Sequence, residues 1–123
     1  MADPAEMNFD AGHPYNEKYN PDWYVKGKGR GATTGVREFA PNALVLYDMS
    51  GNVWEWCWDW YRSDYYSQGN DKNPLGPDGG EEKICRGGSY FVFEYGCRAG
   101  FRSMLAPEYS GRDICFRVVR RAD

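Results

Sequence analysis

Four cysteines and one histidine are the side chains of this sequence best suited to nucleophilic, redox or metal chemistry. The cysteines, at positions 57, 85, 97 and 115, form no C-x-x-C pair and are spaced too widely for a ribbon-type zinc site. They are also few for a disulfide scaffold in 123 residues, so we expect reduced, mostly buried thiols. The single histidine, His13, lies between Gly12 and Pro14 in a loop-like stretch, where we expect a surface residue and not a catalytic base.

A run of alternating tryptophans is the element around which the rest of the chain must be organised. In Trp54–Trp60 an indole recurs at every second position, with Glu55, Cys57 and Asp59 between the indoles. A strand here places four indoles on one face, and two carboxylates with a thiol on the other. We call the first of these the indole face. Because such a face must be covered in a soluble protein, it predicts the floor of either the core or a binding groove.

The length of 123 residues predicts one domain, spanning residues 1–123, with a single modest core. Aromatic residues make up 17% of the chain, so a few large rings should supply most of the buried surface while much of the backbone forms loops. No apolar run approaches membrane-spanning length, and the first residues do not resemble a signal peptide. We therefore expect a soluble chain without membrane insertion, and its compartment stays open.

The remaining elements are predicted to be short. Residues 1–41 show no sustained period, apart from a possible strand over Thr33–Phe39, and residues 62–82 have the composition of a surface loop. Two further β-patterned segments follow, over Lys83–Arg86 and over Ile114–Arg120, and the second alternates in a way that suits a strand near the centre of a sheet. The net charge is −3, and the last 40 residues carry arginine but no lysine. Arginines spaced through short strands usually pair within their own domain, so we do not expect nucleic-acid binding.

Aromatic side chains without a regular period mark the stretch between these last two strands. Interleaved with glycine, serine and arginine, they resemble the composition of binding surfaces more than that of cores. The predicted ligand-contacting residues are Tyr90, Phe91, Phe93, Tyr95, Phe101, Tyr109 and Arg112.

Five ordered motifs resemble the formylglycine-generating-enzyme, or sulfatase-modifying-factor, family. They are YDMSGNVWEW within residues 42–61, NPLGP at 73–77, RGGSY at 86–90, CRAGFR at 97–102 and ICFRVVR at 114–120. The resemblance implies an irregular, loop-rich α+β fold of the C-type-lectin-like kind with short antiparallel strands. The front part of the usual family domain has no counterpart here, so the chain resembles a domain truncated on its N-terminal side.

The resemblance also implies two calcium sites. One would use the Asp48 side chain, the Gly51 and Val53 carbonyls and the Glu55 side chain, around a turn in which Gly51 is best able to adopt positive φ. The other would use the Asn8 side chain, the Phe9 carbonyl, the Asp22 side chain and the Tyr24 carbonyl. The alternative is that Asp48 and Asn8 cap turns, while Glu55 pairs with an arginine.

The enzymes of this family oxidise a substrate cysteine with copper held by two thiolates five residues apart. Here the second position is Cys97 and the first is Val92, which cannot ligate a metal, so copper binding is not expected. Ser89 and Trp54 match family positions near the active site, but both can also serve the scaffold. Other family members are variable proteins of diversity-generating retroelements, which display diversified residues on this fold.

These observations predict a non-catalytic module that binds or displays a protein or peptide ligand through the loops of residues 90–112 on a calcium-stabilised fold. Two alternatives stay open, a formylglycine-generating-type oxidase of protein cysteine and an inactive fragment of one.

Overall fold

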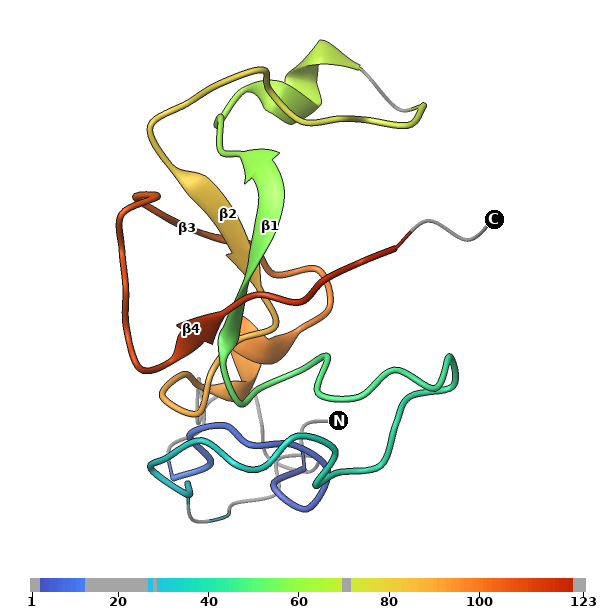
Figure 1. Cartoon of the computed structure of the whole chain (residues 1–123), viewed down its shortest axis with the longest axis vertical. Coiled ribbons are helices and arrows are strands. Elements are labelled where there is room, and N and C mark those ends of the chain that lie inside the picture. Colours follow the sequence, from blue (N-terminus) through green and yellow to red (C-terminus); the bar gives the residue numbers. More distant parts are fainter. Residues whose placement is uncertain (1–2, 13–26, 28, 70–71, 121–123) are drawn as a thin grey trace, which may run out of the picture.

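The computed structural model describes residues 3–12, 27, 29–69 and 72–120. Within these ranges the elements are short and loops join them (Figure 1). In chain order they are β1 (Trp54–Trp60), the 3-10 helix η1 (Tyr65–Gln68), β2 (Lys83–Arg86), the 3-10 helix η2 (Glu94–Cys97), β3 (Ser103–Leu105) and β4 (Ile114–Cys115). No helix in this described part of the chain has the length and apolar character needed to cross a membrane.

The strands form one mixed sheet in the order β3-β2-β1-β4. β1 is antiparallel to β2, with Trp56 opposite Cys85, and β2 is antiparallel to β3, with Ile84 opposite Met104. β4 pairs in parallel with the start of β1. The predicted strands over Trp54–Trp60 and Lys83–Arg86 are confirmed, as is the irregular, loop-rich fold class with a small sheet.

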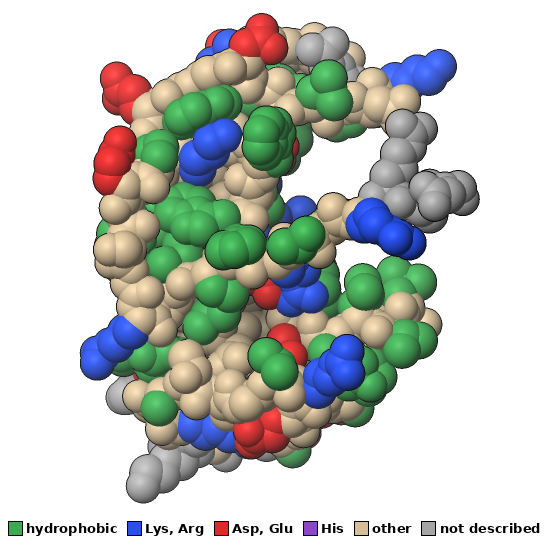
Figure 2. Space-filling view, viewed as in Figure 1, with side chains coloured by type: hydrophobic (Ala, Val, Ile, Leu, Met, Phe, Trp, Pro, Cys, Tyr) green, Lys and Arg blue, Asp and Glu red, His purple; other side chains and the backbone are tan. Residues whose placement is uncertain are grey.

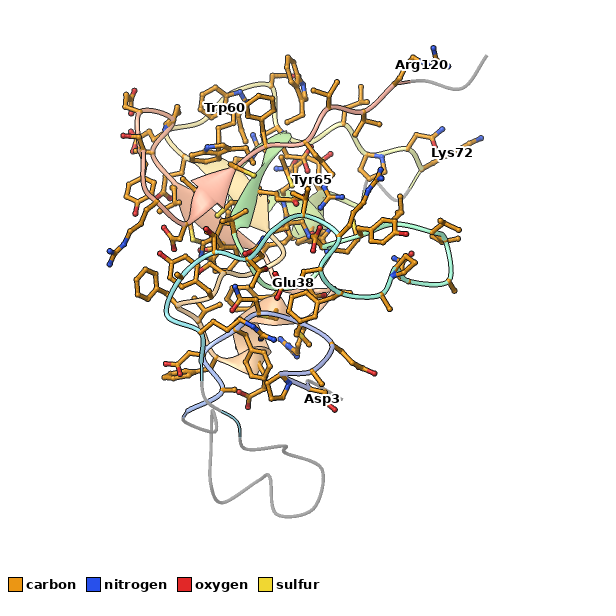
Figure 3. All side chains as sticks on the ribbon, turned by 60° about the horizontal axis from the view of Figure 1, so that its bottom comes forward. Asp3, Glu38, Trp60, Tyr65, Lys72 and Arg120 are labelled. Atoms are coloured by element: carbon orange, nitrogen blue, oxygen red, sulfur yellow. The ribbon has the colours of Figure 1, made fainter. Side chains whose placement is uncertain are left out.

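Two predicted strands were wrong in extent or in place. Only Ile114–Cys115 of the predicted strand Ile114–Arg120 is in the sheet, and it lies at the edge beside β1, not at the centre. Beyond it the chain leaves the sheet, and Arg120 lies at the outer end of this segment (Figure 3). The apolar alternation there buries nothing within the described residues, because Val118 is 86% exposed.

The segment Thr33–Phe39 forms turns and bends instead of a strand. Arg37 adopts a φ of 64°, which interrupts extended backbone. Its amide donates to the Asp48 carboxylate at 2.9 Å, so this segment is held by a side chain and not by a strand partner. A sequence pattern of two-residue period could not reveal such a long-range cap.

The core includes a cluster where the N-terminal loop meets η2. Phe9, Ala11 and Cys97 form a buried cluster, against which Met7 and Val92 pack. Backbone hydrogen bonds fix this loop, since the Asn52 amide donates to the Asn8 carbonyl at 2.7 Å. A segment without regular secondary structure therefore supplies the largest fully buried side chains, together with Ile84 of β2.

The indole face is divided among several environments. Trp54 packs against Phe101, with ring centroids 6.0 Å apart. The Lys83 ammonium lies 5.2 Å from the Trp58 ring centroid and 4.0 Å from that of Trp60. Trp58 is nevertheless 88% exposed, so at this position the indole face borders solvent and is not core.

We expect Trp58→Ala to lower the free energy of unfolding by less than about 1 kcal/mol, because an exposed indole loses little burial and only a weak cation–π contact. Ile84→Ala is the matched control. Ile84 is 1% exposed, and its truncation is expected to cost about 2–5 kcal/mol. Urea unfolding followed by circular dichroism measures both, and equal losses would show that Trp58 is packed as core.

Candidate functional site

The turn before β1 brings together the residues of the first predicted calcium site. Asp48, Gly51 and Asn52 have φ values of 54°, 77° and 70°, so the backbone folds tightly upon itself. The Asp48 oxygen Oδ2 accepts the Arg37 amide, whereas Oδ1 is buried and has no hydrogen-bond partner. A buried carboxylate oxygen without a donor is costly unless a cation or an ordered water satisfies it, so Asp48 fits a calcium ligand.

Glu55 is held by Arg117. The guanidinium donates from Nε and Nη2 to the two carboxylate oxygens, from Nη1 to the Tyr47 carbonyl at 3.2 Å, and from Nη2 to the Asp48 carbonyl at 3.0 Å. The hydrogen bond to Glu55 raises the pKa of Arg117 above its ordinary value. A calcium ion at this turn would therefore share the Glu55 carboxylate with a fixed guanidinium.

Asn8, from the second predicted site, also has an unsatisfied oxygen. Its side-chain nitrogen donates to the Ala32 carbonyl at 2.9 Å and to Asn52 Oδ1 at 3.2 Å. Its Oδ1 is buried and unpaired, which fits a cation ligand beside the Phe9 carbonyl. The other two predicted ligands, Asp22 and Tyr24, lie outside the described residues.

The position that corresponds to the family's copper pair holds one sulfur. Val92 packs against the cluster that contains Cys97, so the two side chains share one environment. Burial, reinforced by Glu94, raises the pKa of Cys97 to about 12, and the thiol is protonated at neutral pH. Among the described residues no group of three or more His, Cys, Asp or Glu side chains is placed to hold a metal ion. Copper chemistry that needs two thiolates does not fit this arrangement.

All four cysteines are free, but they differ in burial. Cys85 is buried like Cys97, and burial raises its pKa to about 11. Cys57 is half-buried and Cys115 is exposed, so the expectation of mostly buried thiols holds for only two of the four. Neither Cys57 nor Cys85 packs in the cluster around Cys97, so neither replaces the missing sulfur.

The predicted ligand-contacting residues separate into two groups. In the first, Tyr90 is 4% exposed and its ring lies 4.2 Å from that of Phe91, which is 46% exposed. Arg112 covers the Phe91 ring at 4.7 Å. We call Phe91 and Arg112, supported from below by Tyr90, the Phe91 platform. Phe93 and Tyr109 are also exposed, whereas Tyr90 is a supporting core residue and offers no surface to a ligand.

The second group is half-buried and packs against β1. The rings of Tyr95 and Phe101 meet edge to face at 5.3 Å, and Phe101 contacts Trp54. Arg98 lies over the Tyr95 ring at 3.9 Å. These residues connect η2 to the sheet, so their main contribution is to the scaffold.

The structure adds a cavity of about 880 Å³ that the motifs did not indicate as a whole. Trp56 and Trp58 line it, together with Arg86, Arg98, Met49 and Val119. Hydrophobic side chains are gathered along the sheet and the C-terminal segment, with hollows and basic side chains between them (Figure 2). The alternating indoles predicted the floor of either the core or a binding groove. The arginines of this cavity come from other segments of the chain, so the sequence pattern could not predict that they lie beside the indoles.

Comparison with known proteins agrees with the motifs. The family model described as "Sulfatase-modifying factor enzyme 1-like domain" matches residues 4–122. The formylglycine-generating enzyme of Streptomyces coelicolor is 37% identical over 98 residues, which are 77% of this chain and 31% of that protein. The serine/threonine-protein kinase pkn1 of Chlamydia pneumoniae is 47% identical over 90 residues, which are 72% of this chain and 14% of the kinase.

Among solved structures, Treponema denticola variable protein 1 has a TM-score of 0.70 and 26% sequence identity. The match covers 92% of this chain and 35% of that one. The chain thus spans about a third or less of the length of these relatives, and both resemblances predicted from the motifs, to the enzymes and to a variable protein, are confirmed.

Proposed function

This chain belongs to the sulfatase-modifying factor enzyme 1-like family, and from that premise we propose that it is a non-catalytic module that binds a protein or peptide ligand through the loops of residues 90–112. The observation that carries the proposal is the Phe91 platform, in which an exposed aromatic ring packs on the buried Tyr90 and lies beneath the Arg112 guanidinium. Aromatic and arginine side chains dominate the energetics of protein interfaces.

The backbone beneath the platform is fixed. The Tyr90 amide donates to the Asn52 carbonyl at 3.0 Å. The Ser89 hydroxyl donates to the Asp113 carboxylate at 3.1 Å, and its oxygen accepts a hydrogen bond from the Phe91 amide at 3.2 Å. A ligand that contacts Phe91 thus meets a surface already in place, which reduces the entropic cost of association. Ser89 acts here as part of the scaffold.

The solved variable protein supports a display role for these loops. If residues 90–112 are diversified, a near-copy of their coding stretch should lie beside a reverse transcriptase gene. The competing function, oxidation of a protein cysteine to formylglycine, is favoured by the relationship to the Streptomyces coelicolor enzyme and by the sulfur retained at Cys97. An inactive fragment of such an enzyme is a third alternative.

We expect Phe91→Ala, Phe93→Ala and Tyr109→Ala each to keep the melting temperature within a few degrees, because all three rings are more than 40% exposed. Peptides selected from a display library on the unmodified chain should bind the Phe91→Ala chain at least about tenfold more weakly, the loss typical of a hot-spot ring. Tyr66→Ala, which removes an exposed ring outside both the platform and the cavity lined by Trp58, is the matched control. If all three loop variants unfold, these rings are core residues and not ligand contacts.

Calcium is the proposed structural ligand of both sites, supported by the unsatisfied Asp48 and Asn8 oxygens. Binding to the folded state alone should raise stability by about 2.7 kcal/mol when calcium is at 100 times its Kd. Asp48→Ala should remove the part of that gain due to the first site, and Asn8→Ala the part due to the second. Differential scanning fluorimetry with calcium, with magnesium and with a chelator measures the effect. An unchanged melting curve on chelation contradicts the proposal.

A further inference from the structure

The cavity of about 880 Å³ lies outside the Phe91 platform and has an apolar floor. Two indoles, Trp56 and Trp58, are joined there by Met49 and Val119. Trp58, Val119 and Met49 are 88%, 84% and 42% exposed, so apolar side chains from three separate segments are open to solvent around the cavity. Single exposed apolar residues are ordinary, but a patch of this kind rimmed by charge is typical of an interaction site.

The charge around this floor is positive and poorly compensated. Arg86, Arg98 and Arg117 line the cavity, and Glu55 is the carboxylate in its lining. Glu55 is engaged by Arg117, whereas neither Arg86 nor Arg98 has an ion-pair partner in the described part of the chain. These two guanidinium groups lie beside apolar surface and can form ion pairs with the carboxylates of a ligand.

Backbone carbonyls hold both of these guanidinium groups in position. Arg86 donates from Nη2 to the Ala99 carbonyl, and Arg98 donates from Nε to the Tyr95 carbonyl at 3.2 Å while stacking on the Tyr95 ring. Each fork uses one N–H group in these contacts and keeps others for a ligand. A fixed guanidinium fork is well suited to carboxylates, which accept two parallel hydrogen bonds.

We propose that this cavity is a second docking site, distinct from the Phe91 platform, for an acidic peptide segment that carries a bulky apolar side chain. The apolar side chain lies on the Trp56–Trp58 floor, and flanking carboxylates bind Arg86 and Arg98. The volume of the cavity, about 880 Å³, is within the range of about 300–1,000 Å³ typical of ligand sites. A nucleic acid is disfavoured, because the cavity offers two uncompensated charges on a chain of net charge −3, too few for strong phosphate binding.

The test uses a fluorescein-labelled heptapeptide that alternates glutamate with phenylalanine, and a matched peptide with lysine in place of each glutamate. Fluorescence anisotropy should show binding of the acidic peptide only, weakening as salt rises to about 0.5 M, where charges are screened within a few ångströms. Arg98→Gln, Arg86→Gln and Trp58→Ala should each weaken binding at least tenfold. Arg62→Gln is the matched control, because Arg62 pairs with Asp64 elsewhere.

Circular dichroism first establishes that each variant is folded. The proposal is overturned if the acidic and lysine peptides bind alike, if neither binds, or if Arg98→Gln and Trp58→Ala both leave the affinity unchanged. It is also overturned if the chain self-associates in sedimentation experiments and Trp58→Ala abolishes that association, since the occupant is then a second copy. Phe91→Ala should leave the affinity for this peptide unchanged, so failure here is distinguishable from failure of the platform.

Discussion

Gly51→Ala is expected to destabilise the domain by about 3 kcal/mol or more, enough to unfold a small protein of ordinary stability. Gly51 has a φ of 77°, and an added Cβ would lie 2.3 Å from the Asn8 carbonyl oxygen. That oxygen cannot easily retreat, because it accepts the Asn52 amide at 2.7 Å, and the Gly51 amide is itself bonded to the Gly87 carbonyl at 2.7 Å. The substitution therefore adds a backbone clash to the strain of a left-handed conformation.

Gly69→Ala separates these two contributions. Gly69 has a φ of 68°, but a Cβ there would meet nothing within 4 Å. It should cost about 1 kcal/mol, the conformational penalty alone, and both substitutions restrict the unfolded chain equally. Urea midpoints measured by circular dichroism give the comparison. Equal losses for the two variants would show that the approach of Asn8 to Gly51 does not hold the fold.

Val92→Cys should create a Cu(I) site where the unmodified chain has a single sulfur. Because Val92 packs in the cluster that contains Cys97, a thiol at position 92 should share that environment. We expect Cu(I) affinity to rise by roughly two orders of magnitude, or about 2.8 kcal/mol at 1.4 kcal/mol per tenfold change. Competition with a colorimetric Cu(I) chelator measures the gain.

Two controls accompany that variant. Val92→Ser keeps the size of the new side chain without its sulfur, and Val92→Cys combined with Cys97→Ser removes the partner. Both should return to the affinity of the unmodified chain. If the double variant keeps the full gain, Cys97 does not occupy the family's ligand position, and Val92 is not the reason that the unmodified chain lacks a copper pair.

Local patterns predicted the parts of the fold that local physics determines. The alternation of Trp54–Trp60 fixed β1, because a period of two has a single interpretation over seven residues. The turn at Gly51 was also visible, since its neighbours are poor strand formers and glycine accepts positive φ. Ordered motifs then supplied the family and the fold class, which no periodicity in so loop-rich a chain could have shown.

Long-range contacts decided the rest. The apolar alternation after Cys115 predicted a central strand, yet nothing among the described residues covers Val118, and Arg117 is held by Glu55 from another strand. Tyr90 looked like a ligand contact in a run of scattered aromatics, but the Asn52 carbonyl fixes its backbone and the ring is buried. Arg86 and Arg98 line the same cavity because the fold brings their segments together, and no local sequence pattern indicates this.

The measurement that tests the central claim most directly is mass spectrometry of a cysteine-containing sulfatase-type peptide incubated with the unmodified chain, Cu(I), oxygen and a thiol reductant that supplies the two further electrons for the reduction of oxygen. We predict that the cysteine mass stays unchanged, because Cys97 is the single sulfur at the position of the family's copper pair, and one sulfur does not hold the metal as a thiolate pair does. The formylglycine-generating enzyme of Streptomyces coelicolor serves as the positive control in the same assay. Conversion of the peptide cysteine to formylglycine by the unmodified chain would contradict the proposal that this domain is a non-catalytic binding module.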